Sequence, residues 1–244
     1  MRNIRLIIEY DGTNYNGWQV QKNLPTVQAA IAGTIRDCLN ENVAVHGAGR
    51  TDSGVHALGQ TANFFTRSKM PASTLLKALN AHLPKDIAIQ KLDEVSENFH
   101  SQYSAKIKIY RYFLYIGRSR PAVNRNFCVT LRRKPDLKSM KKAAKLLLGT
   151  HDFRAFGTKT ADDKNTVRTL YNITISKRGQ YLVTDVKGNG FLYNMVRTIM
   201  GTLLLVGEGK IPPEDVKNIL NSRNRCKAGP TAPAKGLFLQ KIIY

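Results

Sequence analysis

The order in which strand and helix patterns follow one another limits the possible folds of this chain more than any other property. Residues 2–10 alternate like a strand and end at the turn signal Asp11-Gly12. Thr26 has the side chain of an N-cap, and apolar residues recur at helical spacing after it. A further helix over 71–82 and strands around 42–49, 58–66 and 86–92 complete the first half. The resulting order, β-α-β-β-α-β, is that of a ferredoxin-like module.

The second half repeats this order with a longer insertion around 118–135. We predict strands at 106–117, 166–177, 180–187 and 236–244, and helices at 136–148, at 192–206 and after Pro212. The predicted fold is therefore α/β (α+β), with two ferredoxin-like or RRM-like halves at 1–104 and 105–244. Because no Gly-, Ser- or Pro-rich linker separates them, we expect their mainly antiparallel sheets to join around a central cleft, with helices on the outer faces.

Positive charge is concentrated in the second half. Residues 1–104 carry 10 basic and 9 acidic side chains, whereas 105–244 carry 28 and 8. Such an excess favours a polyanionic partner, because neutralising phosphates releases condensed counterions. A solvated basic face or a surface for anionic lipid are the alternatives, but the mixing of aromatic and basic residues in "KIKIYRYFLYIGR" favours RNA.

Several other classes of protein are disfavoured. No apolar stretch approaches the roughly 18 residues of a membrane span, and the start of the chain does not resemble a signal peptide. The three cysteines are far apart, so we expect no disulfide framework, no CxxC zinc site and a reducing, cytoplasmic environment. The sequence has no P-loop, no complete dinucleotide fingerprint and no HExxH motif.

The stretch "GAGRTDSGVHALGQ" at 47–60 is the strongest candidate for a chemical site. Its glycines allow the backbone to approach a ligand closely. Arg50 and Asp52 lie two residues apart within it. They can form a purely structural ion pair across a loop, or Asp52 can be a reactive carboxylate.

Arg197 is the second candidate, because it lies in an otherwise apolar predicted helix. A buried arginine needs an acidic partner, and Asp52 is a candidate for it. The alternative is that Arg197 lies on a solvated stripe of the helix with Asn194 and Thr198.

Nine motifs together resemble the tRNA pseudouridine synthases of the A type. In chain order they are "YDGTNYNGWQVQ", "TVQ", "GAGRTDSGVHALGQ", "ALNAHLP", "FH", "YRYFL", "GTHDFRAF", "NGFLYNMVR" and "APAKGL", and they span nearly the whole chain. For a chain with these motifs, the resemblance implies conversion of uridines 38, 39 and 40 in the tRNA anticodon stem-loop to pseudouridine. It also implies no cofactor or metal, two α/β halves around a cleft, and a homodimer in which tRNA contacts both subunits.

The resemblance also assigns roles to individual residues. It makes Asp52 the catalytic residue, with Arg197 as its partner, while Tyr110 stacks on the target base and Arg50 helps to hold the flipped nucleotide. After "FH" the family usually has Ala-Arg, whereas this chain has Ser101-Gln102. An arginine contact to RNA at that place is therefore in doubt.

The chemistry is consistent with these residue types. The target base must leave its stack, a tyrosine ring provides a platform for it, and an ionised carboxylate can attack C1′ or the base, or abstract a proton. Two other functions compete with this one. A non-catalytic RNA-binding protein made of two ferredoxin-like modules should show RNP-like motifs, and a metal-assisted phosphate enzyme should show clustered acids. The sequence shows neither feature.

Overall fold

The computed structural model describes residues 1–158 and 165–244. Its contacts divide the chain into two compact units, here called unit 1 (Met1–Lys106 with Phe238–Tyr244) and unit 2 (Ile107–Leu237). The secondary structure is mixed α/β, and most of the strand pairs are antiparallel. The predicted fold class is confirmed to this extent.

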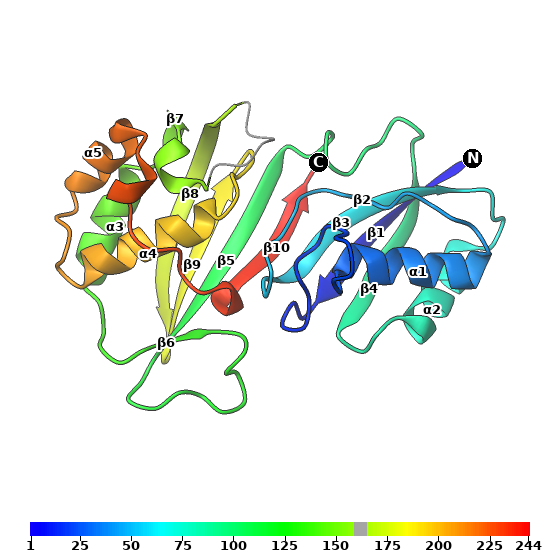
Figure 1. Cartoon of the computed structure of the whole chain (residues 1–244), viewed down its shortest axis with the longest axis horizontal. Helices are drawn as coiled ribbons and strands as arrows, with labels where there is room; N and C mark the ends of the chain where they lie inside the picture. Colours follow the sequence, from blue (N-terminus) through cyan, green and yellow to red (C-terminus); the bar gives the residue numbers. More distant parts are fainter. Residues whose placement is uncertain (159–164) are drawn as a thin grey trace. The chain divides into compact units, whose positions relative to one another are not determined.

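Unit 1 contains the ferredoxin-like strand order. Its sheet runs β4-β1-β3-β10, and β2 also pairs with β3 (Figure 1). The strands are β1 (Arg2–Tyr10), β2 (His46–Gly47), β3 (His56–Thr66), β4 (Ile87–Val95) and β10 (Leu237–Ile243). Helices α1 (Val27–Leu39) and α2 (Ala72–His82) contact each other, and α2 contacts β4. The first half of the chain therefore forms the predicted module.

Local sequence explains where these elements begin and end. Alternate residues of β1 are buried, Ile4, Leu6 and Ile8 completely so, as expected for a strand with one face in a core. The Oγ1 atom of Thr26 accepts a hydrogen bond from the backbone N–H of Ala29 at 3.4 Å, and this caps α1.

The end of the chain differs from the prediction. Residues 237–244 were assigned to the second half, but Phe238–Tyr244 belong to unit 1. The reason is that β10 pairs in parallel with β3, at Phe238 with His56 and at Leu239 with Ala57. The Tyr244 hydroxyl also donates to the carbonyl of Ser101 at 2.9 Å. The last strand therefore completes the sheet of unit 1.

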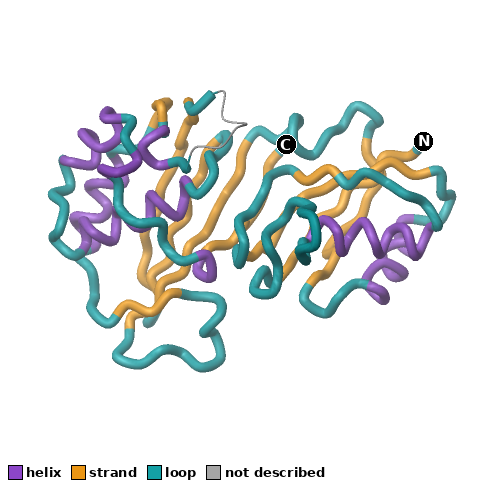
Figure 2. The backbone as a smooth tube through the Cα atoms, in the orientation of Figure 1, coloured by secondary structure: helices purple, strands orange, loops and turns teal. Residues whose placement is uncertain are grey.

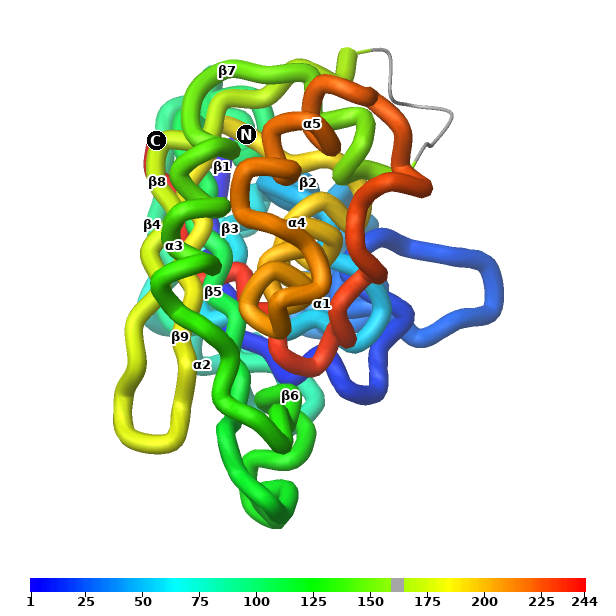
Figure 3. Tube along the Cα trace, turned by 90° about the vertical axis from the view of Figure 1, so that its left-hand side faces the viewer, coloured from blue at the N-terminus to red at the C-terminus, as the bar shows by residue number. Residues whose placement is uncertain are grey.

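Unit 2 has the sheet order β5-β9-β8-β7, with β6 parallel to β5. The strands are β5 (Ile107–Ile116), β6 (Val129–Leu131), β7 (Gly149–Asp152), β8 (Val167–Arg178) and β9 (Tyr181–Gly188). The helices are α3 (Leu137–Lys145), α4 (Met195–Gly207) and α5 (Asp215–Ser222), with the short 3-10 turns η1 (Arg154–Phe156), η2 (Arg225–Lys227) and η3 (Ala234–Gly236). Helix α4 contacts α3 and η1, and η1 in turn contacts α5 and η2. Figures 2 and 3 show the three helices of this unit close together. The strands β6 and β7 were not predicted.

Helix α4 is central to unit 2, since 10 of its 13 residues are buried. It begins at Met195 and not at the predicted Leu192, because Asn194 has a left-handed backbone with φ 61°. A Cβ atom on Gly201 of this helix would lie 1.8 Å from the carbonyl oxygen of Pro230. Within the described residues, no helix is long and apolar enough to cross a membrane.

The approach at Gly201 predicts opposite effects for the same substitution in two helices. Gly201→Ala should destabilise the protein by about 2 kcal/mol or more, because the methyl group overlaps the main chain of Pro230. Gly33→Ala in α1, where a Cβ meets nothing within 4 Å, should stabilise it by up to about 1 kcal/mol. Thermal or urea unfolding of both variants measures this difference, and equal effects would contradict the packing described here.

Candidate active site

The first residues of the loop that carries Asp52 are hydrogen-bonded to β3. The backbone N–H of Ala48 donates to the carbonyl of Thr61 at 2.8 Å. The side-chain amide of Gln60, which is fully buried, donates to the carbonyl of Gly49 at 2.7 Å. The glycine-rich stretch therefore runs from β2 into β3, and its first residues are held against β3.

A second motif, residues 10–18, holds the middle of this loop. The backbone N–H of Trp18 donates to the carbonyl of Thr51 at 3.1 Å, and that of Gly54 donates to the carbonyl of Tyr15 at 3.2 Å. The hydroxyl groups of Tyr10 and Thr51 lie 2.7 Å apart in a buried hydrogen bond. Together these contacts form a clamp between residues 10–18 and 47–60.

Gly17 makes the clamp possible. Its φ is +87°, and a Cβ atom there would lie 2.4 Å from the carbonyl oxygen of Thr51. A side chain at this position would therefore be strained and would also push the loop away. The loop at 47–60 can lie this close to residues 10–18 only because position 17 is a glycine.

Asp52 occupies the first position of a tight turn inside the clamp. The backbone N–H of Val55 donates to the Asp52 carbonyl at 3.1 Å, and Gly54 has φ +74°, which favours glycine. Asp52 is half-buried, while Thr51 and Val55 on either side are buried. Arg50 is exposed. The carboxylate therefore projects from a short segment whose flanking side chains are anchored.

Two buried phenols stiffen the clamp. Burial raises the pKa of Tyr10, against hydrogen bonds that lower it. Burial also raises the pKa of Tyr15, and its hydrogen bond to Asp86, at 2.6 Å, adds to the effect. Both phenols therefore remain neutral over the ordinary pH range.

The histidine of "GVHA" is a structural residue. His56 is 1% exposed and stacks on Phe238, with 4.7 Å between the ring centroids. Its Nδ1 lies 3.0 Å from the backbone nitrogen of Gly12 and 3.1 Å from Asp11 Oδ1, and one nitrogen cannot accept from the first and donate to the second. The backbone N–H can only donate, so we assign Nδ1 as an acceptor and the ring as neutral.

Tyr110 lies on β5 in unit 2. It is 7% exposed, and its ring meets Phe191 edge-on, with 5.1 Å between centroids and 85° between planes. It shares its face of the strand with Lys108 and with Tyr112, whose hydroxyl donates to the carbonyl of Pro233 at 2.7 Å. Tyr110 is thus a largely covered aromatic residue supported by its neighbours.

Arg197 lies in the first turn of α4 and is half-buried. Its Nε donates to the carbonyl of Ala232 at 2.7 Å, and its Nη1 donates to Asn194 Oδ1 at 2.9 Å. The backbone N–H of Ala232 returns a hydrogen bond to the carbonyl of Arg197 at 3.1 Å. The interpretation as a solvated stripe is wrong for Thr198, which is fully buried. The pairing of Arg197 with Asp52 stays a prediction.

Sequence reasoning missed two residues of unit 2. Asn194 caps α4 from a left-handed conformation and orients Arg197. Lys108 has a pKa lowered to about 8, first by burial and then by repulsion from Arg168. Lys108 could have been noticed as a lysine inside the alternating strand "KIKIY". Nothing in the sequence indicates the left-handed backbone of Asn194.

The departure from the family pattern after "FH" has a structural explanation. Ser101 is fully buried. Its backbone N–H donates to Asn63 Oδ1 at 2.9 Å, and its hydroxyl donates to the carbonyl of His46. Gln102 beside it is exposed. Ser101 therefore joins the strands of unit 1 to the segment after β4.

The described residues include no group of three or more His, Cys, Asp or Glu side chains placed to hold a metal ion. The structure brings Arg50 and Asp52 together on one loop of unit 1, and it places Tyr110 and Arg197 on β5 and α4 of unit 2.

Comparison with known proteins assigns the chain to a family. The family model described as tRNA pseudouridine synthase matches residues 6–104 and 143–244. Two proteins named tRNA pseudouridine synthase A are each 48% identical to this chain, over 100% of both chains. They come from Thermoanaerobacter sp. (strain X514) and from Acetivibrio thermocellus. The one from Clostridium kluyveri is 45% identical over the same extent.

Among solved structures, the archaeal box H/ACA sRNP Nop10-Cbf5 complex is similar at 12% identity and a TM-score of 0.37, over 93% of this chain and 60% of that chain. A likeness this weak adds nothing to the assignment. The family model and the full-length relatives are sufficient: this chain belongs to the tRNA pseudouridine synthase family.

Proposed function

We propose that this protein isomerises uridine to pseudouridine at positions 38, 39 and 40 of the tRNA anticodon stem-loop, with Asp52 as the catalytic residue. The observation that carries the proposal is the clamp in unit 1. Two separate motifs hold a half-buried carboxylate on a glycine turn. Such a fixed carboxylate is suited to act on a base that has been flipped out of its stack.

The reaction rearranges bonds within one nucleotide. The C1′–N1 glycosidic bond breaks, the uracil rotates, and C5 bonds to C1′. The hydrogen on C5 leaves as a proton and N1 takes one up, so the product is an isomer of the substrate. Asp52 assists by attacking C1′ or the base, or by removing a proton from C2′.

The other predicted residues have supporting roles in the proposal. Tyr110 supports the flipped base, and comparing Tyr110→Ala with Tyr110→Phe tests this, because only alanine removes the ring. Arg197 supports the charge of the catalytic carboxylate, and Arg197→Lys should keep more turnover than Arg197→Met if that charge matters. Arg50 helps to hold the nucleotide from its exposed position, and loss of tRNA affinity in Arg50→Gln is the test.

The proposal extends to partners and location. We place the protein in the cytoplasm as a homodimer that binds tRNA and needs no cofactor. Its relatives are named for tRNA, and the basic residues of 105–244 suit a phosphate backbone. Light scattering with and without tRNA tests the dimer.

Replacing Asp52 with Asn is the direct test of the catalytic role. The change keeps the size of the side chain but removes its charge and its reactive oxygen. Turnover should fall at least about a thousandfold, while tRNA affinity and melting temperature stay close to those of the parent. The assay is tritium release from tRNA labelled at uridine C5, with a thermal melt run in parallel. Substantial release, or lost stability with retained turnover, would show a structural residue instead.

Because the pKa of Lys108 is lowered, we expect tRNA binding to depend on pH. Its pKa of about 8 means that it is charged below that pH and loses its charge as the pH rises. Because it shares a strand face with Tyr110, tRNA affinity at constant salt should fall about three- to tenfold between about pH 7 and about pH 9. Lys108→Arg should remove this step, because arginine stays charged. A flat profile for the parent protein would rule out a role for the Lys108 charge.

A further inference from the structure

A cavity of about 400 Å³ lies within unit 2, and its lining residues are not among those assigned a role above. Arg154 of η1 borders it, together with two threonines and Leu192, which precedes α4. The residues that follow α5 are Arg223 and Arg225, and the threonines are Thr158 and Thr166. Three arginine residues and a patch of apolar wall therefore border it.

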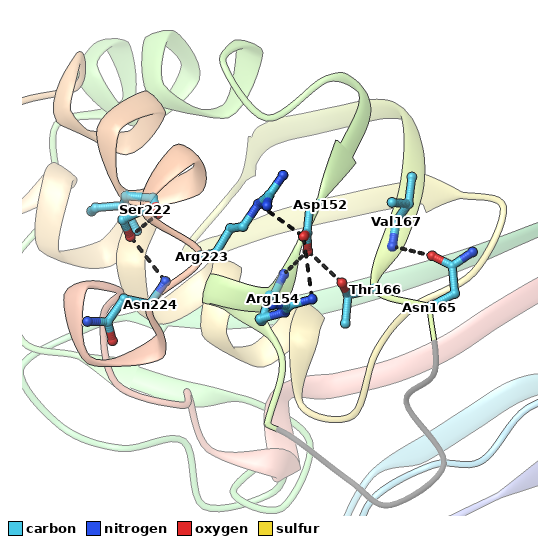
Figure 4. Close-up of polar contacts among 9 residues, drawn as sticks. Asp152, Arg154, Asn165, Thr166, Val167, Ser222, Arg223 and Asn224 are labelled. Carbon is cyan, nitrogen blue, oxygen red and sulfur yellow. Dashed lines mark hydrogen bonds and ion pairs between the residues drawn. The ribbon is translucent and has the colours of Figure 1, made fainter.

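Asp152 contacts three residues that line this cavity, Arg154, Thr166 and Arg223 (Figure 4). Its side chain, 14% exposed, pairs with Arg223 Nε at 3.1 Å and lies 3.8 Å from Arg154 Nη2. It also accepts hydrogen bonds from the hydroxyl of Thr166 at 2.6 Å and from the backbone N–H of Arg154 at 3.0 Å. Burial acts to raise the pKa of Asp152, but the hydrogen bonds and the two arginines outweigh it, so the pKa is lowered. Asp152 is therefore a fixed negative charge at neutral pH.

Among the described residues at the cavity, the charges do not balance. Asp152 lies beside two of the three arginines, Arg154 and Arg223, so these four side chains together carry a net charge of two positive units. Arg154 and Arg223 are each more than 60% exposed, at 61% and 63%. Within the described residues, Arg223 pairs through Nε, and its two Nη groups have no protein partner. The surplus charge is therefore accessible to a ligand.

The backbone at Arg223 is a second sign of a site. Its φ is 53°, in the left-handed region, at the C-terminal cap of α5. Glycine is the usual residue in that conformation, and another residue there costs about 1 kcal/mol. Glycine, however, has no guanidinium to place beside Asp152. Arg225 next to it is held by the carbonyl of Gly229 and the hydroxyl of Thr231, both at 3.0 Å.

Hydrogen bonds connect the cavity wall to Arg197. The side-chain amide of Asn194 donates to the hydroxyl of Thr158 at 3.1 Å, and the carbonyl oxygen of the same amide accepts from Arg197 Nη1 at 2.9 Å. The cavity and the arginine at the start of α4 are thus two parts of one hydrogen-bonded region of unit 2.

We propose that this cavity binds a phosphate group of the tRNA backbone outside the target nucleotide, through Arg154 and Arg223. Guanidinium forks match phosphate oxygens in geometry and charge. The threonine hydroxyls and the apolar wall suit the adjoining sugar. The inference rests on the proposed function, since it takes tRNA to be the substrate.

The experiment measures tRNA affinity by fluorescence anisotropy over a series of salt concentrations. Arg223→Gly and Arg223→Gln should bind about tenfold more weakly than the parent, with the slope of log K against log salt smaller by about one. Arg223→Gly should also melt at or above the temperature of the parent, because glycine relieves the strained backbone. A purely structural ion pair would instead give a lower melting temperature with unchanged affinity and slope.

Arg36→Gln is the matched control. Arg36 is an exposed arginine of unit 1 whose Nε pairs with Asp37 at 3.0 Å, and its side chain is 58% exposed. The Arg36→Gln variant should bind tRNA with the same affinity as the parent protein. Parent-like affinity in both Arg223 variants, or an equal loss in Arg36→Gln, would overturn the proposal.

Inorganic phosphate separates a free anion from the RNA backbone. If phosphate raises the melting temperature of the parent but not of Arg223→Gln, while both bind tRNA equally, the cavity holds a free anion and the proposal is wrong. If the parent protein forms pseudouridine but the Arg223 variants keep full tRNA affinity, the proposed function holds and the phosphate site is wrong. A parent protein that neither binds nor modifies tRNA would remove both.

Discussion

The position of Asp52 depends on the main-chain contact between residues 10–18 and the loop at 47–60. Two backbone hydrogen bonds, from Trp18 and from Gly54, join these segments, and a buried pair of hydroxyl groups adds a third link. Each link stabilises by only about 1 kcal/mol, but together they act on a turn of four residues. Backbone geometry therefore fixes this turn, and the role proposed for the Asp52 carboxylate depends on it.

Unit 2 uses the same principle at Arg197. The glycine at 201 lets the segment after η2 approach α4 closely, and Ala232 in that segment both donates to the main chain of Arg197 and accepts from its guanidinium. Main-chain contacts thus fix both predicted residues within their own units. Long cationic side chains such as Arg223 lie on the surface of unit 2 and, in our proposal, bind phosphate.

The sequence predicts those helices and strands whose formation depends on neighbouring residues. The alternation in 2–10 and the cap at Thr26 gave the correct elements, because burial of one face and capping act over a few residues. The start of α4 and the partner of the last strand could not be predicted, since a left-handed Asn194 and the parallel pairing of β10 with β3 depend on tertiary contacts. The cavity around Asp152 was missed for the same reason: its arginines come from segments about 70 residues apart.

The claim that the clamp positions the catalytic turn can be tested at Gly17, with Gly33→Ala as a control for the same chemical change in open space. The measurement is the single-turnover rate of pseudouridine formation by Gly17→Ala at saturating protein, together with its Kd for tRNA. The clamp predicts a rate more than about tenfold below that of the control, because a methyl group beside the Thr51 carbonyl displaces Asp52, with a Kd within about twofold. A rate equal to that of the control, or a loss found wholly in Kd, would contradict it.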